Sequence, residues 1–157
     1  NGQGGVLAGE ELTWNSQWDR IVDNASNGVT AEGTVLAWLD STQFAGNGGR
    51  SLEAFGDESE VTLYQTTMNG NGGGVYLHGS DGDLQAAYSF ITENGGHGVL
   101  MGHNSELRMD NSLIAYNSGN GIGSSTNMLP ANGARKRAHG PHDGRTLLRK
   151  EIAIWLP

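Results

Sequence analysis

Three short polar segments carry most of the side chains that could bind a ligand or take part in acid–base chemistry. They are FGDESE at residues 55–60, HGSDGD at 78–83 and GHNSE at 102–106. Their candidate ligand-binding residues are Asp57, Glu58, Glu60, His78, Asp81, Asp83, His103 and Glu106. Carboxylates and imidazoles bind cations, accept hydrogen bonds from hydroxyl-rich ligands, or exchange protons with a substrate. The three segments therefore define a candidate site, provided that the fold brings them together.

These segments belong to a repeat of about 23 residues, in which apolar residues two positions apart predict strands with one inward face. The columns of the first strand are Val6, Val29, Leu52, Val75, Val99 and Ile122, then Ala8, Ala31, Ala54, Leu77 and Met101. Those of the second strand are Leu12, Val35, Val61, Leu84 and Leu107, then Trp14, Ala37, Leu63, Ala86 and Met109. The third strand is marked by Ile21, Phe44, Met68, Ile91 and Ile114. Three strands per repeat predict an all-β parallel β-helix, a solenoid of about five coils.

The number of residues between the first and second strands shows where the polar segments lie in each coil. Counted between matching apolar residues, it is 6 residues in the first two coils, as from Val29 to Val35, and 8 or 9 residues in the three later coils. The added residues are the three segments, and because coils stack in register, we expect them to lie side by side. The alternative is that they are solvated turns of an acidic protein. The same oxygen-rich patch makes Asp81 and Asp83 candidate calcium ligands, although no EF-hand spacing is present.

An asparagine follows the third apolar column by three residues in every coil. These asparagines are Asn24, Asn47, Asn71, Asn94 and Asn117. Because Asn beside Gly is typical of left-handed backbone geometry, we expect that geometry at each of them. Stacked asparagines also hydrogen-bond to one another, so the same residues are predicted to form a structural ladder along the coils.

Composition restricts what the chain can bind. Its 157 residues suffice for one domain, its 26 glycines fit many tight turns, and it has no cysteine for a disulfide or a thiolate metal site. The formal net charge is −8, but residues 1–134 carry 15 acidic side chains against 3 basic ones. Such an acidic body repels phosphates, which excludes nucleic acid as its partner. No apolar run reaches the roughly 18 residues of a transmembrane segment.

Three segments resemble the repeats of known β-helix proteins. ITENGGHGVLM and IAYNSGNGIG resemble the right-handed parallel β-helix repeats of the pectin-lyase-like superfamily. FAGNGG resembles the repeats of polymorphic outer-membrane and autotransporter-type surface proteins. The likeness covers residues 1 to about 125 and implies a right-handed helix and an extracellular or cell-surface location. It restricts function weakly, because that superfamily contains lyases, hydrolases, epimerases and adhesins.

Two functions follow from the resemblance and the residues. The first is a non-catalytic segment of an exported bacterial surface or secreted protein, whose stacked loops contact a polysaccharide or a host or cell-surface glycan. The second is a polysaccharide lyase or glycoside hydrolase with its site on the same loops. No complete catalytic set is present, so we favour the first, with no required cofactor. His97 lies in a GHG element that resembles one in polygalacturonases, but the rest of that pattern is missing, so we expect a turn residue.

Tryptophans in the first two coils raise a further binding hypothesis. Trp14, Trp18 and Trp38 have rings that could stack on sugars. However, Trp14 falls in an inward column, and we expect Trp18 and Trp38 to cover the early coils. Packing is therefore the favoured role of all three.

The repeat ends near residue 125, which divides the chain into two parts. Residues 1–125 are the β-helix coils, expected to be truncated on the N-terminal side, and residues 126–157 are a basic tail. One role for the tail is a linker followed by a short capping helix at 146–154, which would cover the strand edges of the last coil. The cluster Arg135, Lys136 and Arg137 suggests instead that the tail binds an acidic partner or an anionic surface. A third alternative is that the tail is not native coding sequence.

Overall fold

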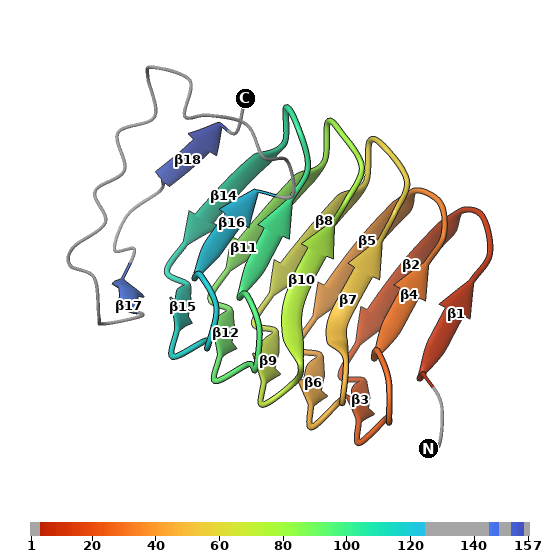
Figure 1. Ribbon diagram of the computed structural model, residues 1–157, viewed down its shortest axis with the longest axis horizontal. Helices are drawn as coiled ribbons and strands as arrows, with labels where there is room; N and C mark the ends of the chain where they lie inside the picture. The colour runs from red at the N-terminus through yellow and green to blue at the C-terminus, as the bar shows by residue number, and fades with distance from the viewer. Residues whose placement is uncertain (1–3, 125–144, 148–151, 156–157) are drawn as a thin grey trace.

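The computed structural model describes residues 4–124, 145–147 and 152–155, in which all regular elements are strands, and those of residues 4–124 stack as coils along one axis (Figure 1). Sheet A contains β1 (Val6–Ala8), β4 (Val29–Ala31), β7 (Arg50–Ala54), β10 (Gly73–Leu77), β13 (Val99–Met101) and β16 (Ile122–Ser124). Sheet B contains β2 (Leu12–Gln17), β5 (Val35–Asp40), β8 (Glu60–Tyr64), β11 (Asp83–Ala87), β14 (Glu106–Asp110) and β18 (Ile152–Trp155). Sheet C contains β3 (Arg20–Val22), β6 (Gln43–Ala45), β9 (Thr67–Asn69), β12 (Phe90–Thr92), β15 (Leu113–Ala115) and β17 (Arg145–Leu147). The described residues contain no helix long and apolar enough to cross a membrane.

The core lies inside the coils, where the three sheets turn their apolar side chains toward one another. In sheet A the predicted columns pair residue by residue, as Val75 does with Leu52 and with Val99. Inward side chains of the middle coils, such as Leu52, Leu63 and Met68, are fully buried. Because strands stack about 4.8 Å apart, each side chain contacts its counterparts in the coils above and below. The predicted all-β solenoid of about five coils is confirmed.

One predicted register in sheet B is wrong. Sequence matching aligned Val35 with Val61, but it is Ala37 that pairs with Val61. Val35 lies instead level with Ser59, whose hydroxyl accepts a hydrogen bond from the Val35 N–H at 3.1 Å. With this register the interval from sheet A to sheet B is 8 or 9 residues in every coil, for example 8 from Val29 to Ala37. The three polar segments therefore differ from the early coils in composition more than in length.

Single residues in left-handed geometry make two corners of each coil. At the corner after sheet C, positive φ occurs at Asp23, Gly46, Gly70, Glu93 and Tyr116, one residue before each asparagine. At the corner between sheets B and C it occurs at Trp18, Ser41, Gln65, Tyr88 and Asn111. The prediction that the asparagines themselves are left-handed is therefore wrong by one residue. Non-glycine residues fill most of these positions at a cost of roughly 1–2 kcal/mol each, which the surrounding coils must offset.

The five asparagines form a continuous hydrogen-bonded ladder along the solenoid. The amide oxygen of Asn47 accepts a bond from Nδ2 of Asn24 at 2.8 Å, and that of Asn71 accepts one from Nδ2 of Asn47 at 2.8 Å. Each of these oxygens also accepts from the backbone N–H of the preceding asparagine, and the Asn71 amide donates to the Phe44 carbonyl at 3.1 Å. All five side chains are buried. The ladder thus satisfies polar groups that would otherwise be unpaired inside the corner.

The C-terminal end of the solenoid is paired with two strands from the tail. β17 lies antiparallel to β15, and β18 lies antiparallel to β14. The predicted helix at 146–154 is therefore wrong where the structure describes that segment. Strands form there because the last coil offers edge N–H and C=O groups, and this pairing outweighs a weak local helix preference. The basic cluster at residues 135–137 lies outside the described residues.

Replacing Asn71 with alanine should lower the free energy of unfolding by roughly 3 kcal/mol, because buried polar groups of Asn47 and Phe44 lose their partners. The matched control is Asn69→Ala, which removes a half-buried amide bonded to side chains of the next coil at 3.2 Å. It should cost under about 0.5 kcal/mol. Urea denaturation followed by circular dichroism measures both. Equal losses in the two variants would contradict a special role for the ladder.

Candidate functional site

The three polar segments join sheet A to sheet B and stack directly on one another, where the loops leave β7, β10 and β13 side by side (Figure 1). The N–H of Glu58 donates to the Ser80 carbonyl, and that of Asp81 donates to the His103 carbonyl, both at 2.8 Å. The turns share a left-handed backbone, with φ of 54° at Glu58, 58° at Asp81 and 53° at Asn104. Residues 55–60, 78–83 and 102–106 thus form one continuous surface of fixed backbone, here named the loop ridge.

The eight candidate residues of the loop ridge differ in their exposure and in their ion pairing. Asp57, Glu58, Glu60 and Asp81 are exposed, whereas His78 and His103 are half-buried. Asp83 and Glu106 are neighbours in sheet B and share Arg108, with Nη1 3.1 Å from Asp83 and Nη2 2.6 Å from Glu106. This cation offsets the repulsion between two adjacent carboxylates. The four exposed carboxylates are therefore the acidic groups of the loop ridge that remain open to solvent.

The calcium hypothesis gains no support from this geometry. In the part of the chain that the structure describes, no group of three or more His, Asp or Glu side chains is arranged to hold a metal ion. Calcium takes six to eight oxygen ligands, and the Asp83 carboxylate is already paired with Arg108. Calcium binding by Asp81 and Asp83 stays a prediction.

Asp57 holds two neighbouring coils together and keeps a negative charge at the surface. Its Oδ1 accepts hydrogen bonds from the N–H and the hydroxyl of Ser80, at 2.7 and 2.9 Å. These bonds, the backbone one first, lower the pKa of the Asp57 carboxyl below its ordinary value of 3.8. On the other side, the Asp57 carbonyl accepts a bond from the Thr34 hydroxyl at 2.8 Å. The exposed carboxylate is consequently ionised and fixed in position at neutral pH.

A second group of polar residues lies on the outer face of sheet A, and of its members only His78 was a candidate from the sequence. Its centre is Glu53, which is 4% exposed although it faces outward. The Glu53 carboxylate lies 2.6 Å from Nδ2 of Asn27, 2.8 Å from Nε2 of His78 and 3.2 Å from Nη1 of Arg50. A buried carboxylate is costly unless donors surround it, and here donors from three coils do so. These four residues are named the Glu53 cluster.

Aromatic rings border the Glu53 cluster and connect it to the loop ridge. The Arg50 guanidinium lies 4.7 Å from the centre of the Tyr76 ring, and Tyr76 meets His78 edge to face at 5.9 Å. His78 in turn stacks on Phe55, with ring centres 4.8 Å apart and an interplanar angle of 6°. Phe55 is 48% exposed. The loop ridge and this face of sheet A therefore form one surface with acidic, aromatic and buried ionic parts.

A sequence signal for the Glu53 cluster exists but is weak. Glu53 lies between two inward apolar residues, Leu52 and Ala54, and so falls in the outward column of sheet A. Outward acidic residues are ordinarily solvated, and nothing local shows that this one is covered. Its partner His78 is 25 residues away, so the contact becomes visible only once the coils are placed in register.

His97 has structural contacts that fit the expected turn role. Its Nδ1 accepts a hydrogen bond from the Asn120 N–H at 2.9 Å, and its own N–H donates to the Tyr76 hydroxyl at 3.0 Å. Both bonds join His97 to a neighbouring coil. The GHG element thus links coils through bonds between backbone N–H groups and side chains.

The three tryptophans have different environments. Trp14 packs edge to face against Phe44 with ring centres 6.2 Å apart, in agreement with its inward position. Trp18 and Trp38 are 73% and 53% exposed. The expectation that these two cover the early coils is therefore wrong. Their outward positions leave both indoles available to a ligand.

The stacked parallel sheets, the asparagine ladder and the left-handed corners define a parallel β-helix. The family described as right handed beta helix region matches residues 3–132. The chain belongs to this family, which confirms the right-handed repeat that the sequence resemblance implied. No match to the chain is found among curated proteins or among solved structures.

Ser80→Ala should raise the pKa of Asp57 only part of the way toward 3.8, because the stronger bond from the Ser80 N–H remains. A carboxyl with a lowered pKa binds fewer protons in the folded than in the unfolded state. Its stabilising contribution is therefore present above its ordinary pKa and lost as the pH falls through its folded pKa. Below about pH 4, the parent should accordingly lose more stability than Asp57→Asn does.

NMR titration of the Asp57 carboxyl carbon measures the pKa, and urea denaturation at several pH values measures the stability. Glu58→Gln is the matched control, because it removes the adjacent exposed charge and leaves the Ser80 bonds in place. An Asp57 pKa at or above 3.8 in the parent would contradict the assigned hydrogen bonds.

Glu53→Ala should lower the free energy of unfolding by roughly 2–3 kcal/mol, because three donors lose a common buried acceptor. Glu53→Gln should lower it less, since an amide oxygen still accepts one of these bonds. Glu60→Ala, which removes an exposed carboxylate from the loop ridge, should change it by under about 0.5 kcal/mol. Urea denaturation ranks the three variants. If Glu53→Ala costs no more than Glu60→Ala, the cluster contributes nothing to the fold.

Proposed function

We propose that the chain is a non-catalytic segment of an exported surface or secreted β-helix protein, and that it contacts carbohydrate through the loop ridge. The observation that carries this proposal is the fixed backbone of the ridge. Each loop is hydrogen-bonded to the next, and the three turns share the same left-handed geometry. A surface that is already ordered binds without the entropic cost of ordering loops.

The side chains of the ridge match a hydroxyl-rich ligand. Four exposed carboxylates accept hydrogen bonds from hydroxyls, and the exposed ring of Phe55, stacked on His78, offers an apolar face. The negative charge disfavours uronates and other anionic sugars. The partner class is accordingly a polysaccharide, or a host or cell-surface glycan, built mainly from uncharged or cationic sugars.

The export part of the proposal rests on the repeats themselves. The Asn-Gly turns resemble those of autotransporter-type surface proteins. An acidic surface also suits a protein that must stay soluble while it presents a long repetitive face.

Four carboxylates of this surface are poorly suited to acid–base catalysis. Glu53 is covered and held by three donors, and Asp83 and Glu106 are paired with Arg108. Asp57 has a lowered pKa, so at neutral pH it holds no proton to donate. These contacts favour a binding role over a lyase or a hydrolase.

The test is a glycan array together with a panel of neutral and acidic polysaccharides, with and without calcium, in which both binding and chain cleavage are followed. The loop variant is Asp57→Asn with Glu58→Gln and Asp81→Asn. Its matched control, Glu10→Gln with Glu11→Gln and Glu32→Gln, removes three exposed carboxylates from the first two coils. Binding should weaken about tenfold or more in the loop variant and stay unchanged in the control.

Equal losses in the two triple variants would contradict the loop ridge as the contact surface. Cleavage that Asp81→Ala or Asp83→Ala abolishes would favour the lyase or hydrolase alternative. Binding that depends on calcium, and loses this dependence in Asp81→Asn, would support the calcium candidate.

A further inference from the structure

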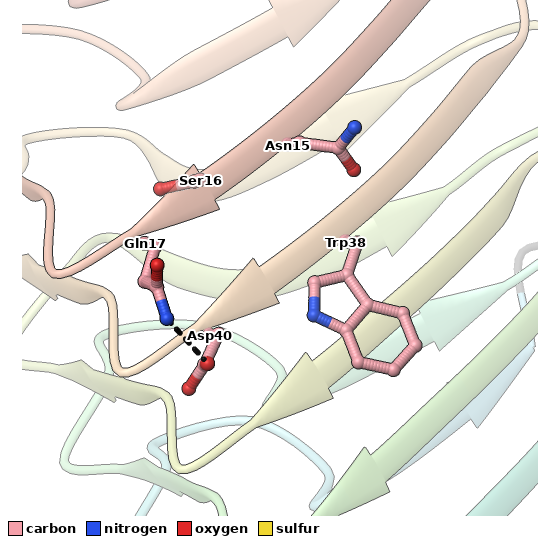
Figure 2. A pocket seen from close by; sticks show the side chains of 5 residues that line it. All are labelled: Asn15, Ser16, Gln17, Trp38 and Asp40. Atoms are coloured by element: carbon pink, nitrogen blue, oxygen red, sulfur yellow. Dashed lines mark hydrogen bonds between the residues drawn. The ribbon is translucent and has the colours of Figure 1, made fainter.

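A shallow groove on the outer face of sheet B has the chemistry of a sugar-binding site (Figure 2). It is lined by Asn15, Ser16, Gln17, Trp38 and Asp40 and has a volume of about 380 Å³. These residues belong to the first two coils, whereas the loop ridge belongs to the three later ones. We propose that this Trp38 groove is a subsite for one uncharged pyranose residue of a polysaccharide, beyond the contact surface of the loop ridge.

Strand register places the four outward side chains of the groove at the corners of one small area. Asn15 of β2 pairs with Trp38 of β5, and Gln17 pairs with Asp40. Adjacent strands lie about 4.8 Å apart, and successive outward residues on one strand lie about 7 Å apart. The area between the four side chains is therefore about as large as a single sugar ring. Figure 2 shows the indole on one side of this area and the Gln17–Asp40 pair on the other. The floor is the strand backbone at Ser16, whose side chain is buried.

Trp38 supplies the apolar contact. Its side chain stands outward from the sheet and is 53% exposed. The face of an indole carries negative charge density, and the C–H groups on one face of a pyranose are apolar and weakly positive, so the two stack favourably. Among the described residues, none accepts a hydrogen bond from the Trp38 indole N–H, which therefore remains a donor for a ligand hydroxyl.

The polar side chains supply directional contacts. Gln17 Nε2 donates to Asp40 Oδ2 at 3.2 Å, and the other Asp40 oxygen accepts a bond from the Ser41 hydroxyl at 2.8 Å. These bonds hold the Asp40 carboxylate in place and use the Gln17 amide nitrogen, so the Gln17 amide oxygen remains an acceptor for a ligand hydroxyl. Asn15 is exposed, and its amide both donates and accepts. Sugar hydroxyls also donate and accept, so amide and carboxylate groups match them.

The charge of the groove restricts the class of sugar. None of the five lining residues is cationic, and Asp40 contributes a carboxylate. A uronate placed here would meet Asp40 without a neutralising partner, in a protein whose net charge is already −8. A wholly apolar ligand would shield Asn15, Gln17 and Asp40 from water without forming hydrogen bonds to their remaining polar atoms. An uncharged pyranose satisfies both restrictions.

The test is isothermal titration calorimetry of the full chain with cellohexaose, mannohexaose and galactohexaose, and with hexagalacturonate as the charged comparison. At least one uncharged hexasaccharide should bind, and hexagalacturonate should bind more weakly. Trp38→Ala should lower the affinity about tenfold or more, and Trp38→Phe should lower it less. Trp18→Ala is the matched control, because it removes another exposed indole, which does not line the groove. It should leave the affinity unchanged.

Three outcomes would overturn the Trp38 groove as a sugar subsite. They are the absence of binding by all three uncharged hexasaccharides, equal affinity for hexagalacturonate, and equal effects of Trp38→Ala and Trp18→Ala. The loop variant described above keeps this result separate from the proposed function. If the loop variant loses binding while Trp38→Ala binds as the parent does, the loop ridge stands and the Trp38 groove fails. If the loop variant binds as the parent does and Trp38→Ala loses binding, the Trp38 groove stands and the loop ridge fails.

Discussion

The structure depends on the hydrogen-bond register between successive coils. Backbone bonds join each strand to the same strand of the next coil, and the asparagine ladder continues this bonding through a corner where no sheet exists. The register places each residue about 4.8 Å from its counterparts in the coils above and below. Each side chain therefore packs between the side chains at the equivalent positions of the two neighbouring coils. Both the loop ridge and the Glu53 cluster arise from this constraint, because each combines residues from coils about 23 positions apart.

Side-chain hydrogen bonding between coils also occurs at the corner between sheets B and C, where hydroxyls take the place of the asparagine amides. The Thr66 N–H donates to the Ser89 hydroxyl at 3.1 Å, and the Ser89 N–H donates to the Ser112 hydroxyl at 3.0 Å. At both corners the polar residue follows a left-handed one, as Ser89 follows Tyr88. A left-handed residue turns the chain sharply but exposes backbone polar groups to the interior. A buried amide or hydroxyl one position later satisfies them, which explains why the two residue types occur as a pair.

The sequence predicted the fold because inward columns of period two leave a strong pattern, but it predicted the register of sheet B incorrectly. Val35 was matched to Val61 by residue type, although strand pairing depends on the backbone and permits alanine beside valine. A better signal was present: the interval from sheet B to the third apolar column is 7 residues in every coil, as from Ala37 to Phe44. The helix expected at 146–154 was wrong for a related reason, since local preference cannot reveal an edge available for pairing. The Glu53 cluster was missed because three coils must be in register before its donors meet.

Inward and outward positions of this solenoid are under different physical constraints, and this difference separates residues that the core requires from residues that it does not. Inward residues must fill a column against apolar neighbours, so most of them are apolar in every coil even where their size differs, as between Trp14 and Ala37. Outward residues are held by the same backbone but contact solvent, so their chemistry varies freely along the axis. Glu53 departs from this rule, because its neighbours bury it and give it a structural role. Trp38 follows the rule, since it is exposed on a fixed backbone and the core does not need its ring. Asp57 is also exposed, but its bonds to Ser80 already give it a place in the fold. Trp38 is thus a residue whose presence the fold leaves unexplained and a ligand would explain.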